Sequence, residues 1–152
     1  MDYALLTEQL EALAREEGWY VPLLSNAAAL LYHALPDLNW AGFYLVRGEE
    51  LILGPFQGKV ACIRIRRDRG VCGAAWRENA VQRVDDVHAF PGHIACDGAS
   101  NAEIVIPLRD AEGRVRAVMD LDSPVLSRFT PQDQQGLERF ARALERAVAW
   151  DG

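Results

Sequence analysis

The run from Trp40 to Val46 constrains the fold most, because it is apolar on both of its faces. Two sets of side chains alternate along it, with Trp40, Gly42, Tyr44 and Val46 on one side and Ala41, Phe43 and Leu45 on the other. Successive side chains of a strand point to opposite faces of a sheet, so this pattern predicts a strand buried on both faces. The fold must therefore place a covering layer on each side of its sheet.

Helical periodicity at both ends of the chain supplies candidates for one layer. Residues 3–17 repeat leucines at helical spacing before Gly18, and an almost wholly apolar helix is predicted from about 22 to 34, between Pro22 and Pro36. The last helix has a predicted start at Thr130, with Pro131 at the first helical position. Its apolar side chains recur every three or four residues, at Leu137, Phe140, Ala141, Leu144 and Val148.

The middle of the chain reads as strands, one short helix and one long loop. Strands are predicted at 51–54, 60–65, 102–108 and 114–121, a short helix at 71–78, and an irregular segment from about 84 to 100. Loops of that length in small domains are usually functional. We therefore expect a single α+β domain over 1–152. Helices in 1–37 and the C-terminal helix should cover one face of an antiparallel sheet of five or six strands, and the long loop the other.

The overall charge and hydropathy pattern exclude some classes of partner. With 16 basic and 22 acidic residues the net charge is -6, which disfavours binding to nucleic acid. An arginine-rich stretch at 64–69 reads as a solvated strand end. We expect no membrane association, because apolar runs stay short of about 20 residues. The first residues do not resemble a signal peptide. A cytoplasmic location is therefore expected, where cysteines stay reduced.

Three cysteines suggest redox chemistry. Cys62 is predicted to lie in a strand, Cys72 at the start of the short helix and Cys96 in the long polar loop. Backbone N–H groups at a helix start favour a thiolate, which indicates reactivity for Cys72. Their spacing matches no common zinc signature, although three Cys and one His remain a conceivable zinc set. Each thiol could alternatively be a small core residue.

Acidic side chains converge on the predicted sheet near the loop. Asp120 and Asp122 share one face of their strand, and Glu103 lies on the neighbouring strand. Carboxylates gathered in this way repel one another, which raises the pKa of at least one of them and makes it a proton donor near neutrality. The same groups could bind a cation, or they could be ordinary surface acids. A modest turn would bring the Cys96 sulfur close to them.

Several longer strings resemble the free methionine-(R)-sulfoxide reductases, small cytoplasmic enzymes of the GAF fold. The matching strings occur in order and include all three cysteines: NWAGFYL at 39–45, GPFQGKVACIRI at 54–65, RGVCG at 69–73, ACDGASNAEI at 95–104 and MDLDS at 119–123. The resemblance implies reduction of the R epimer of free L-methionine sulfoxide, with electrons from the thioredoxin/NADPH system. It implies no bound cofactor and no metal. In this family the N-terminal helices contribute to a homodimer.

The resemblance also implies a role for each site residue. Cys96 would attack the sulfoxide and become a sulfenic acid, and Cys62 would be the preferred resolving thiol that forms a disulfide with it. Cys72 corresponds to a third cysteine with a catalytic or recycling role in some members. Trp40 would receive the methyl end of the substrate, while the carboxyl groups of Glu103, Asp120 and Asp122 would bind it and protonate its oxygen. The alternative is a GAF sensory module that binds a small molecule without catalysis.

Overall fold

The sheet has six antiparallel strands in the order β3-β2-β1-β6-β5-β4 over the part of the chain that is described. The computed structural model describes residues 1–93 and 98–151. Its helices are α1 (Tyr3–Glu16), α2 (Tyr20–Ala34), α3 (Gly70–Glu78), the short 3₁₀ helix η1 (Val87–Ala89) and α4 (Pro131–Ala147). Its strands are β1 (Trp40–Arg47), β2 (Glu50–Gly58), β3 (Arg64–Arg66), β4 (Gln82–Val84), β5 (Ala102–Arg109) and β6 (Val115–Ser123). The predicted α+β class and the antiparallel sheet are confirmed.

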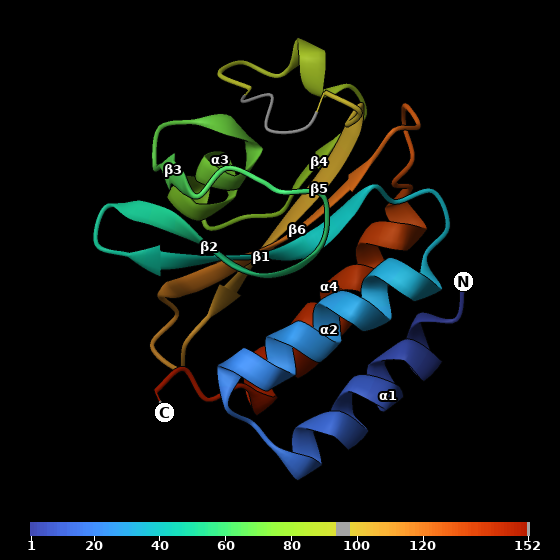
Figure 1. Ribbon diagram of the computed structural model, residues 1–152, viewed down its shortest axis with the longest axis vertical. Coiled ribbons are helices and arrows are strands. Elements are labelled where there is room, and N and C mark those ends of the chain that lie inside the picture. The colour runs from blue at the N-terminus through green and yellow to red at the C-terminus, as the bar shows by residue number, and fades with distance from the viewer. Residues whose placement is uncertain (94–97, 152) are drawn as a thin grey trace.

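Three helices form one layer against the sheet. Figure 1 shows α1, α2 and α4 side by side on one face, with both termini on that side. Their apolar faces join the inner side of β1, β5 and β6 in the larger hydrophobic cluster, which includes Leu10, Leu31, Phe43, Met119 and Phe140. The alternation along β1 thus places Phe43 in this layer and leaves Trp40 and Tyr44 for the other face.

Local signals at the ends of α4 agree with its packing. Thr130 caps the helix in a reciprocal capping box with Asp133, and Pro131 occupies the first turn, as predicted. Asp133 also accepts a hydrogen bond from the Tyr3 hydroxyl at 2.7 Å, which ties α1 to the start of α4. Gly136 permits this contact, because a Cβ there would lie 2.2 Å from the Tyr3 ring.

The second layer consists of α3 and the segments around it. Val71, Cys72, Ala75 and Trp76 of α3 pack with Tyr44, Ile65 and Val105 in a smaller hydrophobic cluster on the opposite face of the sheet. The Arg67 guanidinium lies 4.9 Å from the centre of the Trp76 ring. The Gly70 N–H donates to the Gly92 carbonyl at 2.9 Å, so the described part of the long loop is joined to the start of α3.

Two details of the predicted strands were wrong. β2 continues through Gly54 and Pro55, where a turn was predicted, because a register irregularity opposite Gly42 and Tyr44 accommodates the kink. Residues 60–63 are not in a strand: β3 begins at Arg64, so Cys62 lies in a connecting loop. The short edge strand β4 was not predicted, since three residues carry too little periodicity.

No helix within residues 1–93 and 98–151 is both long enough and apolar enough to cross a bilayer.

Candidate active site

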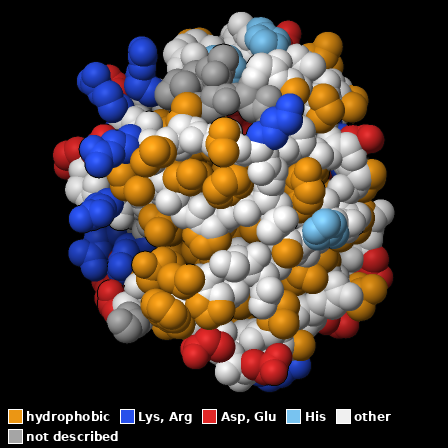
Figure 2. Space-filling model, viewed as in Figure 1, with side chains coloured by type: hydrophobic (Ala, Val, Ile, Leu, Met, Phe, Trp, Pro, Cys, Tyr) orange, Lys and Arg blue, Asp and Glu red, His pale blue; other side chains and the backbone are white. Residues whose placement is uncertain are grey.

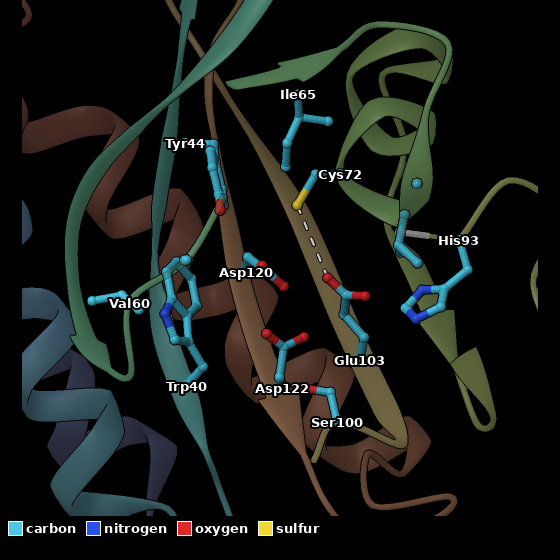
Figure 3. Close-up of a pocket in the computed structure, with 13 residues that line it drawn as sticks. Trp40, Tyr44, Val60, Ile65, Cys72, His93, Ser100, Glu103, Asp120 and Asp122 are labelled. Atoms are coloured by element: carbon cyan, nitrogen blue, oxygen red, sulfur yellow. Dashed lines mark hydrogen bonds between the residues drawn. The ribbon is translucent and has the colours of Figure 1, made fainter. Parts of the chain in front are cut away.

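A pocket lies on the sheet face that α3 covers, and it combines acidic, thiol and aromatic side chains. Figure 3 shows these groups pointing toward one another from β1, β5, β6 and α3. Its lining includes five residues singled out from the sequence, namely Trp40, Cys72, Glu103, Asp120 and Asp122. It also includes Tyr44, Val60, Ala61, Ile65, Gly70, Val71, His93 and Ser100.

Strand register brings the three carboxyl groups together. Glu103 of β5 is directly paired with Asp122 of β6, and Asp120 lies two residues away on the same face of β6. On the other side of β6, Trp40 pairs with Asp122 and Gly42 with Asp120. The predicted convergence of the acids is therefore present, and it follows from the two-residue repeat of adjacent strands.

Burial makes two of these acids weak. Glu103 is 8% exposed and Asp120 is 4% exposed. Loss of hydration raises the pKa of Glu103 well above its usual range, and the neighbouring Asp120 raises it further. The pKa of Asp120 is raised in the same way, first by burial and then by the charge of Asp122. Both shifts favour the protonated form of these two carboxyl groups.

Cys72 contributes a buried thiol to this cluster. Its Sγ lies 3.9 Å from Glu103 Oε2 and donates a weak hydrogen bond toward it. Burial raises the pKa of this thiol well above its usual range, and the charges of Asp120 and Glu103 act in the same direction. The prediction that the start of a helix would favour a Cys72 thiolate was wrong, because desolvation and nearby acids oppose the effect of the backbone N–H groups.

The wall opposite the thiol is aromatic. The Trp40 ring is stacked on Phe56, with centroids 5.2 Å apart, and on Tyr44, with centroids 5.8 Å apart. Gly42 sits beneath this stack: a Cβ there would lie 2.8 Å from Trp40 Cη2 and 2.4 Å from Phe56 Cβ. Because Gly42 has no side chain, the Trp40 indole can lie beside Asp120 and Asp122.

Hydrogen bonds from the same wall hold the loop that carries Cys62. Trp40 Nε1 donates to the Lys59 carbonyl at 3.2 Å, and the Tyr44 hydroxyl donates to the Cys62 carbonyl at 2.9 Å. Cys62 is disulfide-bonded, whereas Cys72 is a free thiol. Cys96 lies outside the described residues, so its position and its role stay predictions.

Sequence reasoning gave no site role to several residues that line the pocket. Tyr44 was assigned only to a buried strand, although its place two residues after Gly42 and four after Trp40 puts it on the same face. His93 and Ser100 also line the pocket. Ser100 accepts a hydrogen bond from Asn39 Nδ2 at 3.0 Å, which joins the loop to the start of β1.

Comparison with known proteins gives this geometry its context. Residues 24–149 match the GAF domain family. The free methionine-R-sulfoxide reductase of Escherichia coli is 52% identical over 147 residues, which span 97% of this chain and 88% of that protein. This chain belongs to the free methionine-R-sulfoxide reductase family.

Solved structures place this reductase family member among proteins with the same overall fold. The free methionine-R-sulfoxide reductase of Neisseria meningitidis in complex with its substrate superposes with a TM-score of 0.91 and 43% identity, covering 95% of this chain and 87% of that one. The reduced form of the Staphylococcus aureus protein named fRMsr superposes with a TM-score of 0.93 and 44% identity, covering 97% of this chain and 96% of that one.

The space beneath Trp40 gives a prediction for this member of the reductase family. Gly42→Ala should destabilise the protein by about 1–3 kcal/mol, because the new methyl group overlaps the aromatic stack and the neighbouring strand must shift. Urea unfolding measures the change. Gly98→Ala is the matched control, since a Cβ at Gly98 meets nothing within 4 Å. Equal stability of the two variants would contradict the proposed role of Gly42.

The raised carboxyl pKa values give a second prediction, on stability and pH. Native Glu103 and Asp120 retain protons that an unfolded chain loses above about pH 4, so their contribution to the free energy of unfolding decreases as pH rises through their native pKa values. Glu103→Gln removes part of this dependence. Relative to wild type, the variant should therefore become more stable as pH is raised.

Urea unfolding of both proteins at several pH values from about 5 to 8 tests this prediction. Ser100→Ala is the control, because it alters the pocket without removing a titratable group. A stability difference between Glu103→Gln and wild type that stays constant across this range would show that Glu103 ionises normally in the native protein.

Proposed function

We propose that this protein reduces free L-methionine-(R)-sulfoxide to L-methionine. The observation that carries the proposal is the pair of buried acids, Glu103 and Asp120, which face an aromatic wall across the same pocket. The proposal is supported by relatives with this activity in their names, including the yeast free methionine-R-sulfoxide reductase, which is 42% identical over 147 residues.

Proton supply is the first requirement of this reaction. A sulfoxide is a poor electrophile until its oxygen is protonated or strongly hydrogen-bonded, so a neutral carboxyl group beside it lowers the barrier. Glu103 and Asp120 are the candidates, because burial raises the pKa of both. The oxygen would leave the substrate for the attacking sulfur as the S–O bond breaks.

Recognition of a free amino acid is the second requirement. The substrate ammonium would pair with an ionised member of the acidic cluster, for which the partly exposed Asp122 is best placed. The S-methyl group would pack against the Trp40 indole, which is held flat by Phe56 and Tyr44. A residue inside a polypeptide has no ammonium to offer, so the free amino acid should be preferred.

The third requirement is a thiol cycle, in which we assign Cys96 as the attacking thiol. Cys96 takes the oxygen to become a sulfenic acid, and methionine is released. The Cys62 thiol then displaces water from that sulfenic acid to give a disulfide, which a thioredoxin dithiol reduces by exchange. NADPH supplies the two electrons through the thioredoxin system. This cycle requires no bound cofactor.

The structure favours Cys62 over Cys72 as the resolving thiol on two grounds. Cys62 is disulfide-bonded and lies in a loop attached to the pocket wall through the Tyr44 hydroxyl. Cys72 is buried among acids, where thiolate formation is disfavoured. The cytoplasmic location and the homodimer expected from the sequence remain predictions.

A coupled assay tests the activity. Purified protein with thioredoxin, thioredoxin reductase and NADPH should oxidise NADPH when free L-methionine-(R)-sulfoxide is added, and the S epimer is the control substrate. Cys96→Ser should reduce the rate to background. Glu103→Gln should lower kcat/KM by about 10²–10⁴, the usual contribution of a positioned acid. Full activity of Cys96→Ser would exclude Cys96 as the nucleophile, and equal rates with both epimers would exclude the proposed specificity.

A count of turnovers tests the assignment of the resolving thiol. Cys62→Ser should release one equivalent of methionine per protein and then stop with thioredoxin as reductant, because its sulfenic acid has no partner. Cys72→Ser should continue beyond one equivalent, whatever its rate. Quantifying methionine against enzyme after a fixed time distinguishes the two. The opposite pattern would assign the resolving role to Cys72.

A further inference from the structure

Three side chains in the pocket are arranged as ligands for a single metal ion. Cys72 Sγ and one carboxylate oxygen each of Glu103 and Asp120 all lie within 4.8 Å of one another, and all three residues are buried. They come from three different elements, α3, β5 and β6, and Figure 3 shows their polar atoms facing the same space. The activity proposed above uses the two carboxyl groups but gives this thiol no necessary part.

The cluster is rich in acceptors and lacks a positive charge. Asp120 is 96% buried (4% exposed), and its Oδ1 atom has no hydrogen-bond partner although it faces the pocket. Within residues 1–93 and 98–151, the ion pairs of Arg side chains involve other acids and none includes Glu103 or Asp120. A buried carboxylate oxygen without a partner is costly, and a cation would satisfy it.

The distances suit a small tetrahedral ion. Ligands at the usual Zn–S and Zn–O lengths are about 3.6 Å apart in tetrahedral geometry, and Cys72 Sγ lies 3.9 Å from Glu103 Oε2. The three ligand atoms lie within 4.8 Å of one another, so shifts of roughly 1 Å would close the site. The two carboxyl groups are held by paired strands, and the thiol by a helix packed on them.

We propose that Cys72, Glu103 and Asp120 form a three-ligand site for a borderline divalent cation of the zinc class, and that this ion and the amino-acid substrate exclude each other. A thiolate ligand selects Zn²⁺ or Co²⁺ over Mg²⁺ and Ca²⁺, which need six or more oxygen ligands. The fourth ligand position faces the pocket. A bound ion would occupy the place where the substrate meets the two acids, so it would act as an inhibitor.

Cobalt reports this site directly, because a thiolate–Co²⁺ bond gives a charge-transfer band that carboxylates alone do not give. Reduced wild-type protein titrated with Co²⁺ should develop the band with a stoichiometry of one, and Zn²⁺ should remove it by displacement. Cys72→Ser should lose the band, whereas Cys62→Ser should keep it. Absence of the band in wild type, or its retention in Cys72→Ser, would overturn the proposal.

Thermal unfolding shows whether each variant is folded and measures ion binding independently of the cobalt band. Zn²⁺ should raise the Tm of wild type, since an ion that binds only the native state stabilises it. Asp120→Asn, which keeps the shape of the side chain, should weaken Co²⁺ binding at least tenfold and lose most of the Tm increase. An unchanged affinity in folded Asp120→Asn would remove Asp120 from the ligand set.

Competition tests the exclusion, which rests on the proposed function. In Cys96→Ser, where no turnover is expected, free L-methionine-(R)-sulfoxide should bleach the cobalt band. The S epimer is a matched control, because it chelates Co²⁺ equally in solution. Equal bleaching by both epimers, or none while calorimetry detects binding of the R epimer, would contradict a shared position. If calorimetry finds no binding of the R epimer, the proposed function fails and the cobalt titration still decides the metal site.

Discussion

The pairing of β5 with β6 is the constraint on which the rest of the site depends. Glu103 lies directly opposite Asp122 in this register, with Asp120 two residues along the same face. A slip of one residue would turn the carboxyl groups of the shifted strand into the helical layer and remove the apolar side chains of that strand from it. The large hydrophobic cluster therefore strongly disfavours such a slip. The core that stabilises the fold therefore also enforces the closeness of acids that would otherwise repel one another.

Raised pKa values reduce this repulsion, because they favour the protonated forms of the cluster. Two buried carboxyl groups and a thiol share a small space, and burial raises the pKa of each. The same property has two chemical consequences. In the two proposed roles, the cluster would donate a proton when no cation is bound and would act as a ligand set when one is. Whether a substrate ammonium or a metal ion occupies the pocket should decide which behaviour is observed.

Much of the architecture could be predicted from the sequence because its signals are local and periodic. The terminal helices, the doubly buried β1 and the shared face of Asp120 and Asp122 all follow from side-chain spacing. The position of Cys62 could not be predicted in this way. Apolar residues on either side of it imitate a strand, while the actual loop is set by hydrogen bonds to Trp40 and Tyr44, far away in the sequence.

The raised pKa of the Cys72 thiol could not be predicted from the neighbouring sequence either. Its place at the start of α3 indicates a reactive thiolate, but the acids that oppose ionisation come from β5 and β6. The residues to which family resemblance assigned substrate binding, Trp40, Glu103, Asp120 and Asp122, all line one pocket. The resemblance could not supply the distances on which the chemistry of each group depends.

The two hydrophobic clusters lie on opposite faces of one sheet, which has a consequence for how this protein can change. The helical side is a large cluster of aliphatic and aromatic side chains, none of which lines the pocket, while the pocket side is a small cluster interrupted by acidic groups. Figure 2 shows basic side chains gathered along one edge of the surface, with apolar ones spread beside them. Most of the hydrophobic stabilisation therefore comes from the helical face of the sheet. Side chains on the pocket face can change substrate specificity at a smaller cost in stability.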